Sequence, residues 1–365
     1  MESSQEKILI TGITGFIGSW VGKEFLDNLD ATKYKIRASV RSLANKNKLD
    51  PLRQEFGEEA FNRIEFVEAD LNDKVSLINA VQGVQYIIHV ASPIPGAINL
   101  TEKQMCDATK IGMEAIIEAA VQNKVKRIVV TSSLATIFGG HWKRRPGVES
   151  VYNEDDIAPL EGADSYAKSK IIQEQVIREF NQKQRETNPE HIVEIVTIHP
   201  TFVIGPSLIT ERNSSAEGIA KLINRQIPGV PNITMPSVDV RDVAHAHLLA
   251  FLQPGLHGER FIITQQNLVF NEFADILDAE LRQHGYRVQT RRVGYCPLKI
   301  ASWFDTQVKI VLPLINAQFS VENKKSVEVL GIQYNRELKT TIIEMGYSLI
   351  DKGLVPEKRK NHQKL

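Results

Sequence analysis

A glycine-rich segment near the N-terminus, with the sequence TGITGFIG at residues 11–18, constrains the fold of this chain more than any other feature. It lies between a short β-branched run, Lys7–Thr11, and an apolar-periodic stretch, Phe16–Leu29, so it joins a predicted strand to a predicted helix. The first glycine permits a tight turn, the second lets backbone approach a ligand, and the third lets the helix pack closely on the strand. The helix N-terminus then offers unpaired N–H groups to phosphates. We therefore predict a dinucleotide-binding unit rather than a turn without a ligand.

Short β-branched runs alternate with longer helical patterns through the first half of the chain. The predicted strands are Lys7–Thr11, Tyr34–Val40, Ile64–Ala69, Tyr86–Val90, Arg127–Thr131 and Val193–His199. Between them, helices are predicted at Phe16–Leu29, Asp73–Val81, Thr101–Asn123 and Ser165–Gln184. Strands separated by helices in this rhythm form right-handed crossovers in a parallel sheet. The sequence thus predicts an α/β fold with a doubly wound sheet.

The alternation ends after Gly205, where prolines and glycines become frequent. We expect a smaller, discontinuous substrate lobe there, with one segment of chain returning to the main sheet. The predicted division places 1–205 and 238–263 in the dinucleotide-binding domain, 206–237 and 264–356 in the substrate lobe, and 357–365 in a flexible tail.

The composition excludes several classes of function. The 44 basic and 44 acidic residues cancel, so no global field favours nucleic acid or an anionic membrane. No apolar run approaches the roughly 20 residues of a spanning helix. The two cysteines, Cys106 and Cys296, lie in no metal or redox spacing. We expect a soluble cytoplasmic protein, a monomer or homodimer, that binds a small molecule and no metal.

The residues after the second and third predicted strands indicate which dinucleotide binds. Enzymes that use NAD carry an acidic residue at the end of the second strand. This chain has Arg41 there, and a planar, permanently charged guanidinium suits a ribose 2′-phosphate. Lys48 can add a second charge, although either residue could be a solvated surface cation. After the third strand, Asp70 and Leu71 could bracket the adenine, and the alternative for Asp70 is a helix cap.

A tyrosine and a lysine, Tyr166 and Lys170, open the helix predicted at Ser165–Gln184, and their i, i+4 spacing places them on one face. A nearby ammonium lowers the pKa of a phenol, which is about 10 in free tyrosine. Ser133 follows the fifth strand, at the sheet edge where parallel sheets bind ligands, and its hydroxyl can hold a developing oxyanion or simply cap the strand. These three residues predict a site for proton-coupled hydride transfer.

With these motifs the chain resembles the extended short-chain dehydrogenase/reductases of the NAD-dependent epimerase/dehydratase family. Within them it is most similar to the dihydroflavonol reductase and fungal-type carbonyl reductase branch. The resemblance spans roughly Lys7 to Pro356 and rests on TGITGFIG at 11–18, VRSLANKNKL at 40–49, VASPI at 90–94, TSS at 131–133, YAKSK at 166–170, HPTFVIGP at 199–206 and VDVRDVAHAH at 238–247.

The resemblance implies a Rossmann fold, NADP(H) as cofactor, and Ser133, Tyr166 and Lys170 as catalytic residues. The residues it assigns to the cofactor are Thr11, Gly12, Gly15, Phe16, Ile17, Gly18, Arg41, Lys48, Asp70, Leu71, Ala91, Ser92, Pro93, Thr131, Tyr166, Lys170, Pro200, Thr201, Val203 and Ser214. It implies reduction of an aldehyde or ketone to an alcohol, with tyrosine as the proton donor. Two alternatives remain: a nucleotide-sugar epimerase or dehydratase, against which Arg41 argues, and a non-enzymatic NADP(H) sensor, which would not need Tyr166.

Two departures from the family pattern bear on the substrate. Gly112-Met113 stands where the family usually has glycine and threonine, so a hydrogen bond is lost there. Phe138 stands where the flavonoid enzymes carry an asparagine or aspartate that holds substrate hydroxyls. Since a phenyl ring cannot accept those bonds, we expect a substrate with an apolar flank, beside Phe138, Phe202 and Trp303.

Overall fold

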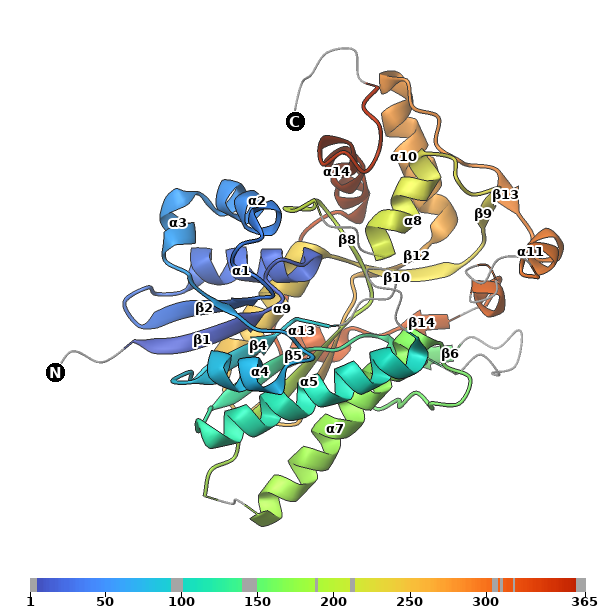
Figure 1. The fold of residues 1–365 in the computed structure, drawn as a ribbon. Helices are drawn as coiled ribbons and strands as arrows, with labels where there is room; N and C mark the ends of the chain where they lie inside the picture. The colour runs from blue at the N-terminus through green and yellow to red at the C-terminus, as the bar shows by residue number, and fades with distance from the viewer. Residues whose placement is uncertain are drawn as a thin grey trace.

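The computed structural model describes residues 5–92, 101–139, 150–187, 190–210, 214–303, 308, 311–317 and 319–358. Its central element is a seven-stranded sheet in which all neighbouring strands are parallel (Figure 1). Across the sheet, the order is β11 (Arg260–Ile263), β7 (Glu194–Pro200), β5 (Arg127–Thr131), β4 (Tyr86–His89), β1 (Glu6–Thr11), β2 (Tyr34–Val40) and β3 (Glu65–Glu68).

Helices cover both faces of this sheet, which confirms the predicted doubly wound α/β fold (Figure 1). One face carries α4 (Lys74–Val81), α5 (Glu102–Gln122) and α7 (Ser165–Thr187), and the other carries α1 (Phe16–Asn28) and α9 (Val240–Leu252). The strands serve both layers because alternate side chains point to opposite faces. In β1, Leu9 packs beneath α4, α5 and α7, whereas Ile8 and Ile10 pack beneath α1 and α9.

The strand order fixes where a ligand can bind. From β1 the chain proceeds to β2 and β3 on one side, and from β4 it proceeds outward on the other side. The adjacent carboxyl ends of β1 and β4, at Thr11 and His89, therefore form a topological switch point. In open α/β sheets a crevice for ligands opens at such a point.

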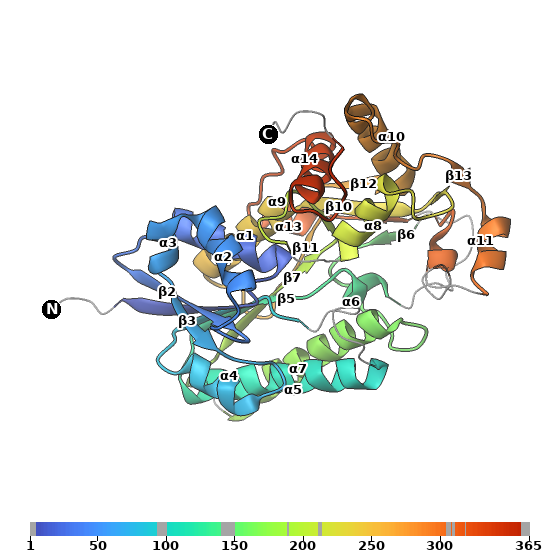
Figure 2. The same cartoon turned by 45° about the horizontal axis from the view of Figure 1, so that its top comes forward.

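A smaller lobe lies beyond the carboxyl ends of the strands (Figure 2). It contains a three-stranded sheet, β12-β10-β8, and a two-stranded sheet, β13-β9, packed against three helices. The strands are β8 (Phe202–Ile204), β9 (Val230–Pro231), β10 (Thr234–Asp239), β12 (Gln266–Val269) and β13 (Arg292–Val293). The helices are α8 (Ser214–Ile223), α10 (Phe270–Leu281) and α14 (Leu338–Asp351), with the short α11 (Tyr295–Ala301) at the edge.

Parts of the chain cross between the main sheet and the smaller lobe. Most of residues 238–263 return to the main sheet as expected, through α9 and β11. Strand β10, which contains residues 238 and 239, belongs to the smaller sheet, where it pairs with β8 and β12. Residues 319–332, expected in the lobe, lie against the main sheet: β14 (Phe319–Val321) pairs with β6 (Ser150–Tyr152), and α13 (Lys324–Glu328) packs on β11. Leu330 and Ile332 are buried in the core beneath α1 and α9. The sequence boundaries of the two predicted domains stay a prediction.

In the described first half of the chain, three helices lie outside the predicted elements. Between β2 and β3 the structure has α2 (Lys46–Phe56) and α3 (Glu58–Asn62), and after β5 it has the four-residue α6 (Ala135–Phe138). Helix α2 contains Pro51 and is mostly polar, and its few apolar residues, Leu49, Leu52 and Phe56, have the i, i+3, i+7 spacing of an amphipathic helix. It is held to the core by a few buried side chains, among them Leu52 and Phe56.

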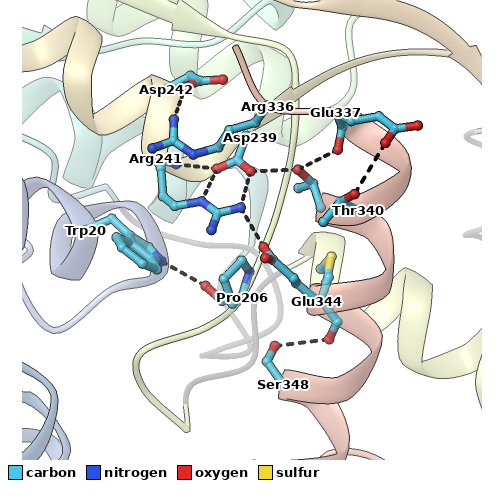
Figure 3. A network of polar contacts seen from close by, with 12 residues as sticks. Trp20, Pro206, Asp239, Arg241, Asp242, Arg336, Glu337, Thr340, Glu344 and Ser348 are labelled. Carbon is cyan, nitrogen blue, oxygen red and sulfur yellow. Dashed lines mark hydrogen bonds and ion pairs between the residues drawn. The ribbon is translucent and has the colours of Figure 1, made fainter. Parts of the chain in front are cut away.

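A buried polar network attaches α14 to the main domain (Figure 3). Asp239, which is 0% exposed, caps the N-terminus of α9 and receives hydrogen bonds from Arg241 and from the Thr341 hydroxyl at 2.6 to 2.9 Å. Arg241 also contacts Glu344 on α14 at 2.6 Å. The charge of the buried carboxylate is thus compensated by groups from two elements, as a buried charge requires.

Candidate active site

The glycine turn admits no larger residue at two of its positions. Gly12 has φ +74°, and a Cβ built on it would lie 2.7 Å from the backbone nitrogen of Ala91. A Cβ on Gly18 would lie 1.9 Å from the carbonyl oxygen of Gly12. These close approaches keep β1, the turn and α1 in contact with the end of β4.

The start of α1 fits the phosphates of a dinucleotide. The N-cap residue is Gly15, and no side chain caps the helix, so the first N–H groups are available to an anion. The side chains of Phe16 and Ile17 pack into the core, so at the helix N-terminus these two residues offer their backbone, and not their side chains, to a ligand. Opposite, Ser92 has a buried hydroxyl for which the described residues supply no hydrogen-bond partner. A polar atom left unpaired beside a glycine cradle fits a bound polar ligand.

The second strand ends in an exposed cation. Arg41 is exposed, and the loop after it is held by a 2.8 Å hydrogen bond from the Leu43 nitrogen to Glu68. Lys48 lies partly buried in the first turns of α2. This arrangement leaves the Arg41 guanidinium on the surface beside the end of β2, where a ribose 2′-phosphate would be met.

Asp70 and Leu71 lie at the end of β3, as predicted. The Asp70 carboxylate accepts hydrogen bonds from the nitrogen and the side-chain amide of Asn72, at 2.8 and 2.9 Å, so it caps its own turn. The carbonyl oxygen of Leu71 would lie 3.3 Å from a Cβ on Gly112, so α5 packs closely here. Met113, on α5 itself, is buried in the core between α5 and the sheet.

Tyr166 lies in the first turn of α7 and faces Ser133. Burial raises the pKa of Tyr166, the hydrogen bond with Ser133 opposes this by lowering it, and the nearby Asp164 carboxylate raises it further. The net direction is upward, so the phenol carries its proton at neutral pH. Asp164 also holds the start of α7, because it accepts a 2.9 Å hydrogen bond from the Ala167 nitrogen.

The turn that carries Ser133 is fixed between β5 and α6. The nitrogen of Ser132 donates to the carbonyl oxygen of Ile198 at 2.7 Å, and that of Leu134 donates to Pro200 at 3.0 Å. The Ser133 hydroxyl accepts from the Ala135 nitrogen at 3.2 Å. Backbone bonds to β7 therefore determine where the serine hydroxyl lies. That hydroxyl caps the turn, and its predicted role in holding an oxyanion stays a prediction.

Lys170 is buried one helical turn after Tyr166. Its side chain is 2% exposed and donates to the carbonyl oxygen of Thr131 at 3.0 Å and to Gln173 at 3.2 Å. Burial lowers the pKa of Lys170 to about 8. Gln173 was not singled out from the sequence, although its i, i+3 spacing from Lys170 could have indicated it.

Three buried histidines surround this group, and their contacts were not predicted from the sequence. His89 lies 3.0 Å from the Thr11 hydroxyl, and His247 lies 2.7 Å from the Thr131 hydroxyl. The third, His199, follows on β7. Burial lowers the pKa of each imidazole, to about 3 for His89 and His199 and about 4 for His247. Neutral imidazole rings therefore lie behind the site. His247 contacts the hydroxyl of Thr131, and the carbonyl oxygen of Thr131 accepts a hydrogen bond from Lys170.

The remaining predicted cofactor residues are found near the end of β7 or outside the described part. Thr201 directs its hydroxyl to the Ile263 carbonyl oxygen and to Thr264, at 3.3 and 3.2 Å. Val203 is buried in the main core. Pro93 and the side chain of Ser214 lie outside the described residues.

On the substrate side, Phe138 belongs to an aromatic cluster. Its ring stacks on Phe319 with centroids 4.4 Å apart and meets the edge of Tyr152 at 5.0 Å. Phe202 packs against Phe273 in the smaller lobe, with centroids 5.8 Å apart. Trp303 is 72% exposed, so the structure does not place it in this cluster. No described helix is long and apolar enough to span a membrane, and the described residues form no metal-binding group of three.

Comparisons with known proteins agree with this geometry. Residues 8–264, from within β1 to the end of β11, match the NAD dependent epimerase/dehydratase family. The chain is 30% identical over 355 residues to cinnamoyl-CoA reductase 1 of Petunia hybrida, covering 97% of this chain and 95% of that protein. It is also 30% identical over 274 residues to cinnamoyl-CoA reductase 1 of Arabidopsis thaliana, covering 74% and 73% of the two chains.

Solved structures share the fold over nearly the whole chain. The yeast methylglyoxal/isovaleraldehyde reductase complexed with NADPH has a TM-score of 0.75 at 23% identity and covers 94% of this chain and 98% of its own. Vestitone reductase from alfalfa, Medicago sativa, has a TM-score of 0.69 at 24% identity, covering 96% and 100%. This chain therefore belongs, as an oxidoreductase, to the NAD-dependent epimerase/dehydratase family of extended short-chain dehydrogenase/reductases, on the branch of the dihydroflavonol and carbonyl reductases.

Proposed function

We propose that this protein uses NADPH to reduce an aldehyde or ketone to the alcohol, as an oxidoreductase of the class that acts on CH–OH groups. The observation that carries the proposal is the buried Lys170, which donates to the Thr131 carbonyl oxygen at the carboxyl end of β5, one helical turn after a Tyr166 that faces Ser133. This pairing suits a carbonyl oxygen that gains a proton as it is reduced. The names of the relatives support it, since they include reductases of a cinnamoyl-CoA, a tetraketide α-pyrone and methylglyoxal.

The residues of this chain divide the chemistry between them. When bound, NADPH supplies the hydride to the carbonyl carbon. Tyr166 donates its proton to the carbonyl oxygen, and Ser133 holds that oxygen as negative charge develops. Because burial raises the pKa of Tyr166, the phenol is protonated before the reaction and able to act as the acid. Lys170, held by Thr131 and Gln173, provides a fixed cation for the developing phenolate and for the nicotinamide ribose.

The choice of NADPH rests on Arg41. A charged guanidinium at the end of β2 can pair with the 2′-phosphate, which NADH lacks. Lys48 in α2 lies close in sequence to the same loop and supports this pairing. An acidic residue at the end of β2, the usual partner of the NAD ribose, is absent at this position.

The proposed substrate has an apolar flank. Phe138 carries no group that can bond a substrate hydroxyl, and its neighbours Phe319 and Tyr152 are aromatic. A buried hydroxyl without a partner costs on the order of 1–3 kcal/mol, so a polyphenol would bind less well than an aryl or branched-alkyl ketone.

The test is a screen of NADPH oxidation by the purified protein with a panel of aldehydes and ketones. Reduction of at least some of them, with one alcohol formed for each NADPH consumed, is the expected result. A nucleotide-sugar epimerase or dehydratase would leave the total amount of reduced cofactor unchanged, and a sensor would bind NADPH without turnover. Either of these results would contradict the proposed function.

A further inference from the structure

The back of the Ser133 turn is in contact with a buried histidine on β7. His199 is 0% exposed, and its Nδ1 lies 2.9 Å from the Thr136 hydroxyl and 3.3 Å from the carbonyl oxygen of Ser133. Its Nε2 lies 2.8 Å from the Thr197 hydroxyl. Thr136 is also buried, at 1% exposure, and its nitrogen and hydroxyl lie 3.1 and 3.0 Å from the Ser133 carbonyl oxygen. The Ser133 carbonyl oxygen is thus in contact with both His199 and Thr136.

A buried carboxylate on α7 lies beside Thr136 and His199. It belongs to Glu174, which is 5% exposed and lies 2.8 Å from the guanidinium of Arg260. Burial raises the pKa of Glu174, but the neighbouring positive groups lower it overall, so the group is a carboxylate. The Thr136 hydroxyl donates its single proton to the Ser133 carbonyl oxygen at 3.0 Å.

This proton placement determines the tautomer of His199. Because the Thr136 hydroxyl donates to Ser133, the Thr136 oxygen and the Ser133 carbonyl oxygen are both acceptors facing Nδ1, so Nδ1 carries the hydrogen. Nε2 then accepts the proton of the Thr197 hydroxyl. The charged groups that act on the ring are Glu174 and Lys170 from α7 and Arg260 from β11, and burial keeps the imidazole neutral.

The same helix carries the carboxylate and the proton donor. Tyr166, Lys170 and Glu174 are spaced i, i+4 and i+8 on α7, so they lie along one helix face. Ser133 faces the first of these residues, Tyr166, and Thr136 lies beside the last, Glu174. The turn at the end of β5 therefore lies against α7 at two places, one on each side of Lys170.

We propose that His199 and Thr136 are positioning residues, which together with Glu174 hold the Ser133 turn so that the serine hydroxyl reaches Tyr166. The inference rests on the proposed function, because it assigns Ser133 and Tyr166 to the reaction. Neither residue touches the substrate in this scheme. Their effect reaches the chemistry through the Ser133–Tyr166 hydrogen bond, which lowers the pKa of the phenol.

The test compares isosteric and conservative variants of each residue. Thr136→Val keeps the shape and removes the hydroxyl, and Thr136→Ser restores it. His199→Leu removes both nitrogens, and His199→Asn keeps an amide N–H that can donate to Ser133. Thr341→Val is the matched control, since Thr341 is equally buried and its hydroxyl donates to the Asp239 carboxylate in the network that attaches α14 to the main domain.

We expect Thr136→Val and His199→Leu to lower kcat about tenfold, the size of effect that one lost hydrogen bond supports. The KM for NADPH should change less than about twofold, since the glycine turn and Arg41 are untouched. Thr136→Ser and His199→Asn should recover most of the lost kcat. Thr341→Val should lower the melting temperature and leave kcat unchanged, which separates positioning from a general loss of stability.

A second readout does not depend on activity. The ionisation of Tyr166 is followed by tyrosinate absorbance, as the difference between each protein and the same protein carrying Tyr166→Phe. The phenol should titrate at higher pH in Thr136→Val and His199→Leu than in the wild type or in Thr341→Val. Unchanged titration together with unchanged kcat in both variants would overturn the positioning role. If instead Tyr166→Phe alone left turnover intact, the proposed function would fail, whereas the titration would still report the geometry.

Discussion

The Lys170 ammonium donates a hydrogen bond to the carbonyl oxygen of Thr131, the last residue of β5, across 3.0 Å. The cation of the site is therefore anchored to the central sheet by backbone. It is also nearly excluded from water, and burial lowers its pKa to about 8 from the usual lysine value of 10.5. A buried charge placed for function costs stability, and this cost is measurable.

We predict that Lys170→Met stabilises the cofactor-free protein at neutral pH. The folded protein binds the Lys170 proton less tightly than the unfolded chain, so between about pH 8 and 10.5 the unfolded chain holds more protons and wild-type stability rises with pH. One pKa unit corresponds to about 1.4 kcal/mol, and the lost bonds to Thr131 and Gln173 offset part of the gain, so we expect about 1–2 kcal/mol.

Urea unfolding of both proteins at neutral pH and near pH 10.5 checks this expectation. The difference in the free energy of unfolding between Lys170→Met and the wild type should be smaller at the higher pH. A variant that is less stable than wild type at neutral pH would show that the hydrogen bonds of Lys170 outweigh its burial.

Arg41→Ala should remove the preference for NADPH. Charged hydrogen bonds of the kind proposed for Arg41 contribute about 1.5–3 kcal/mol, so kcat/KM with NADPH should exceed that with NADH at least about tenfold in the wild type. In the variant the two values should converge, mainly through a higher KM for NADPH. Steady-state kinetics with both cofactors test this, and equal use of the cofactors by the wild type would refute it.

The buried Asp239 should contribute far more to stability than its exposed neighbour in the network. Asp239→Asn removes the charge that compensates Arg241 in a site with 0% exposure, so we expect a loss of about 3–5 kcal/mol in the free energy of unfolding. Glu344, whose side chain is 39% exposed, makes the matched comparison. Glu344→Gln should cost less than about 1 kcal/mol. Similar losses for the two variants would mean that α14 is not held by the buried carboxylate.

Phe138→Asn should alter which carbonyl compounds are reduced. The wild type is expected to prefer an aryl or branched-alkyl ketone over a dihydroflavonol at matched concentration. An asparagine amide can bond substrate hydroxyls, so the variant should shift toward the dihydroflavonol about tenfold, the value of one such bond. If the preference did not move, Phe138 would serve the aromatic cluster with Phe319 and Tyr152 and would not contact the substrate.

The elements that local pattern determines were predictable from the sequence. The strands Tyr34–Val40 and Arg127–Thr131 are found where they were predicted, and the continuous β-branched run in the second suits a strand buried on both faces. The glycine turn was predictable because steric exclusion at Gly12 and Gly18 leaves no other residue type. Elements that depend on distant partners were not, since β6 pairs with β14 across more than a hundred residues. Helix α2 was missed although Leu49, Leu52 and Phe56 have helical spacing, and it contains Pro51, a residue that disfavours a helix interior.

The contacts that hold the site residues also divide into local ones, which the sequence reveals, and contacts between distant elements, which it does not. The spacing of Tyr166 and Lys170 is local, so the motif revealed it. By contrast, His199 and His247 meet Thr136 and Thr131 only after β7 and α9 have packed against β5. No local spacing in the sequence brings these groups together, and a buried histidine without a local partner looks like any core residue.

The most direct test of the central claim is the rate of NADPH oxidation by wild type and by Tyr166→Phe with the best substrate of the carbonyl panel. The exchange removes the proton donor and keeps the ring, and general-acid catalysis contributes about 10²–10⁴-fold. We therefore predict that turnover falls at least about a hundredfold while NADPH binding, followed by its fluorescence, stays within about twofold. A variant that keeps more than about a tenth of the wild-type turnover would contradict the assignment of Tyr166 as the acid, because so small a loss is below what such catalysis contributes.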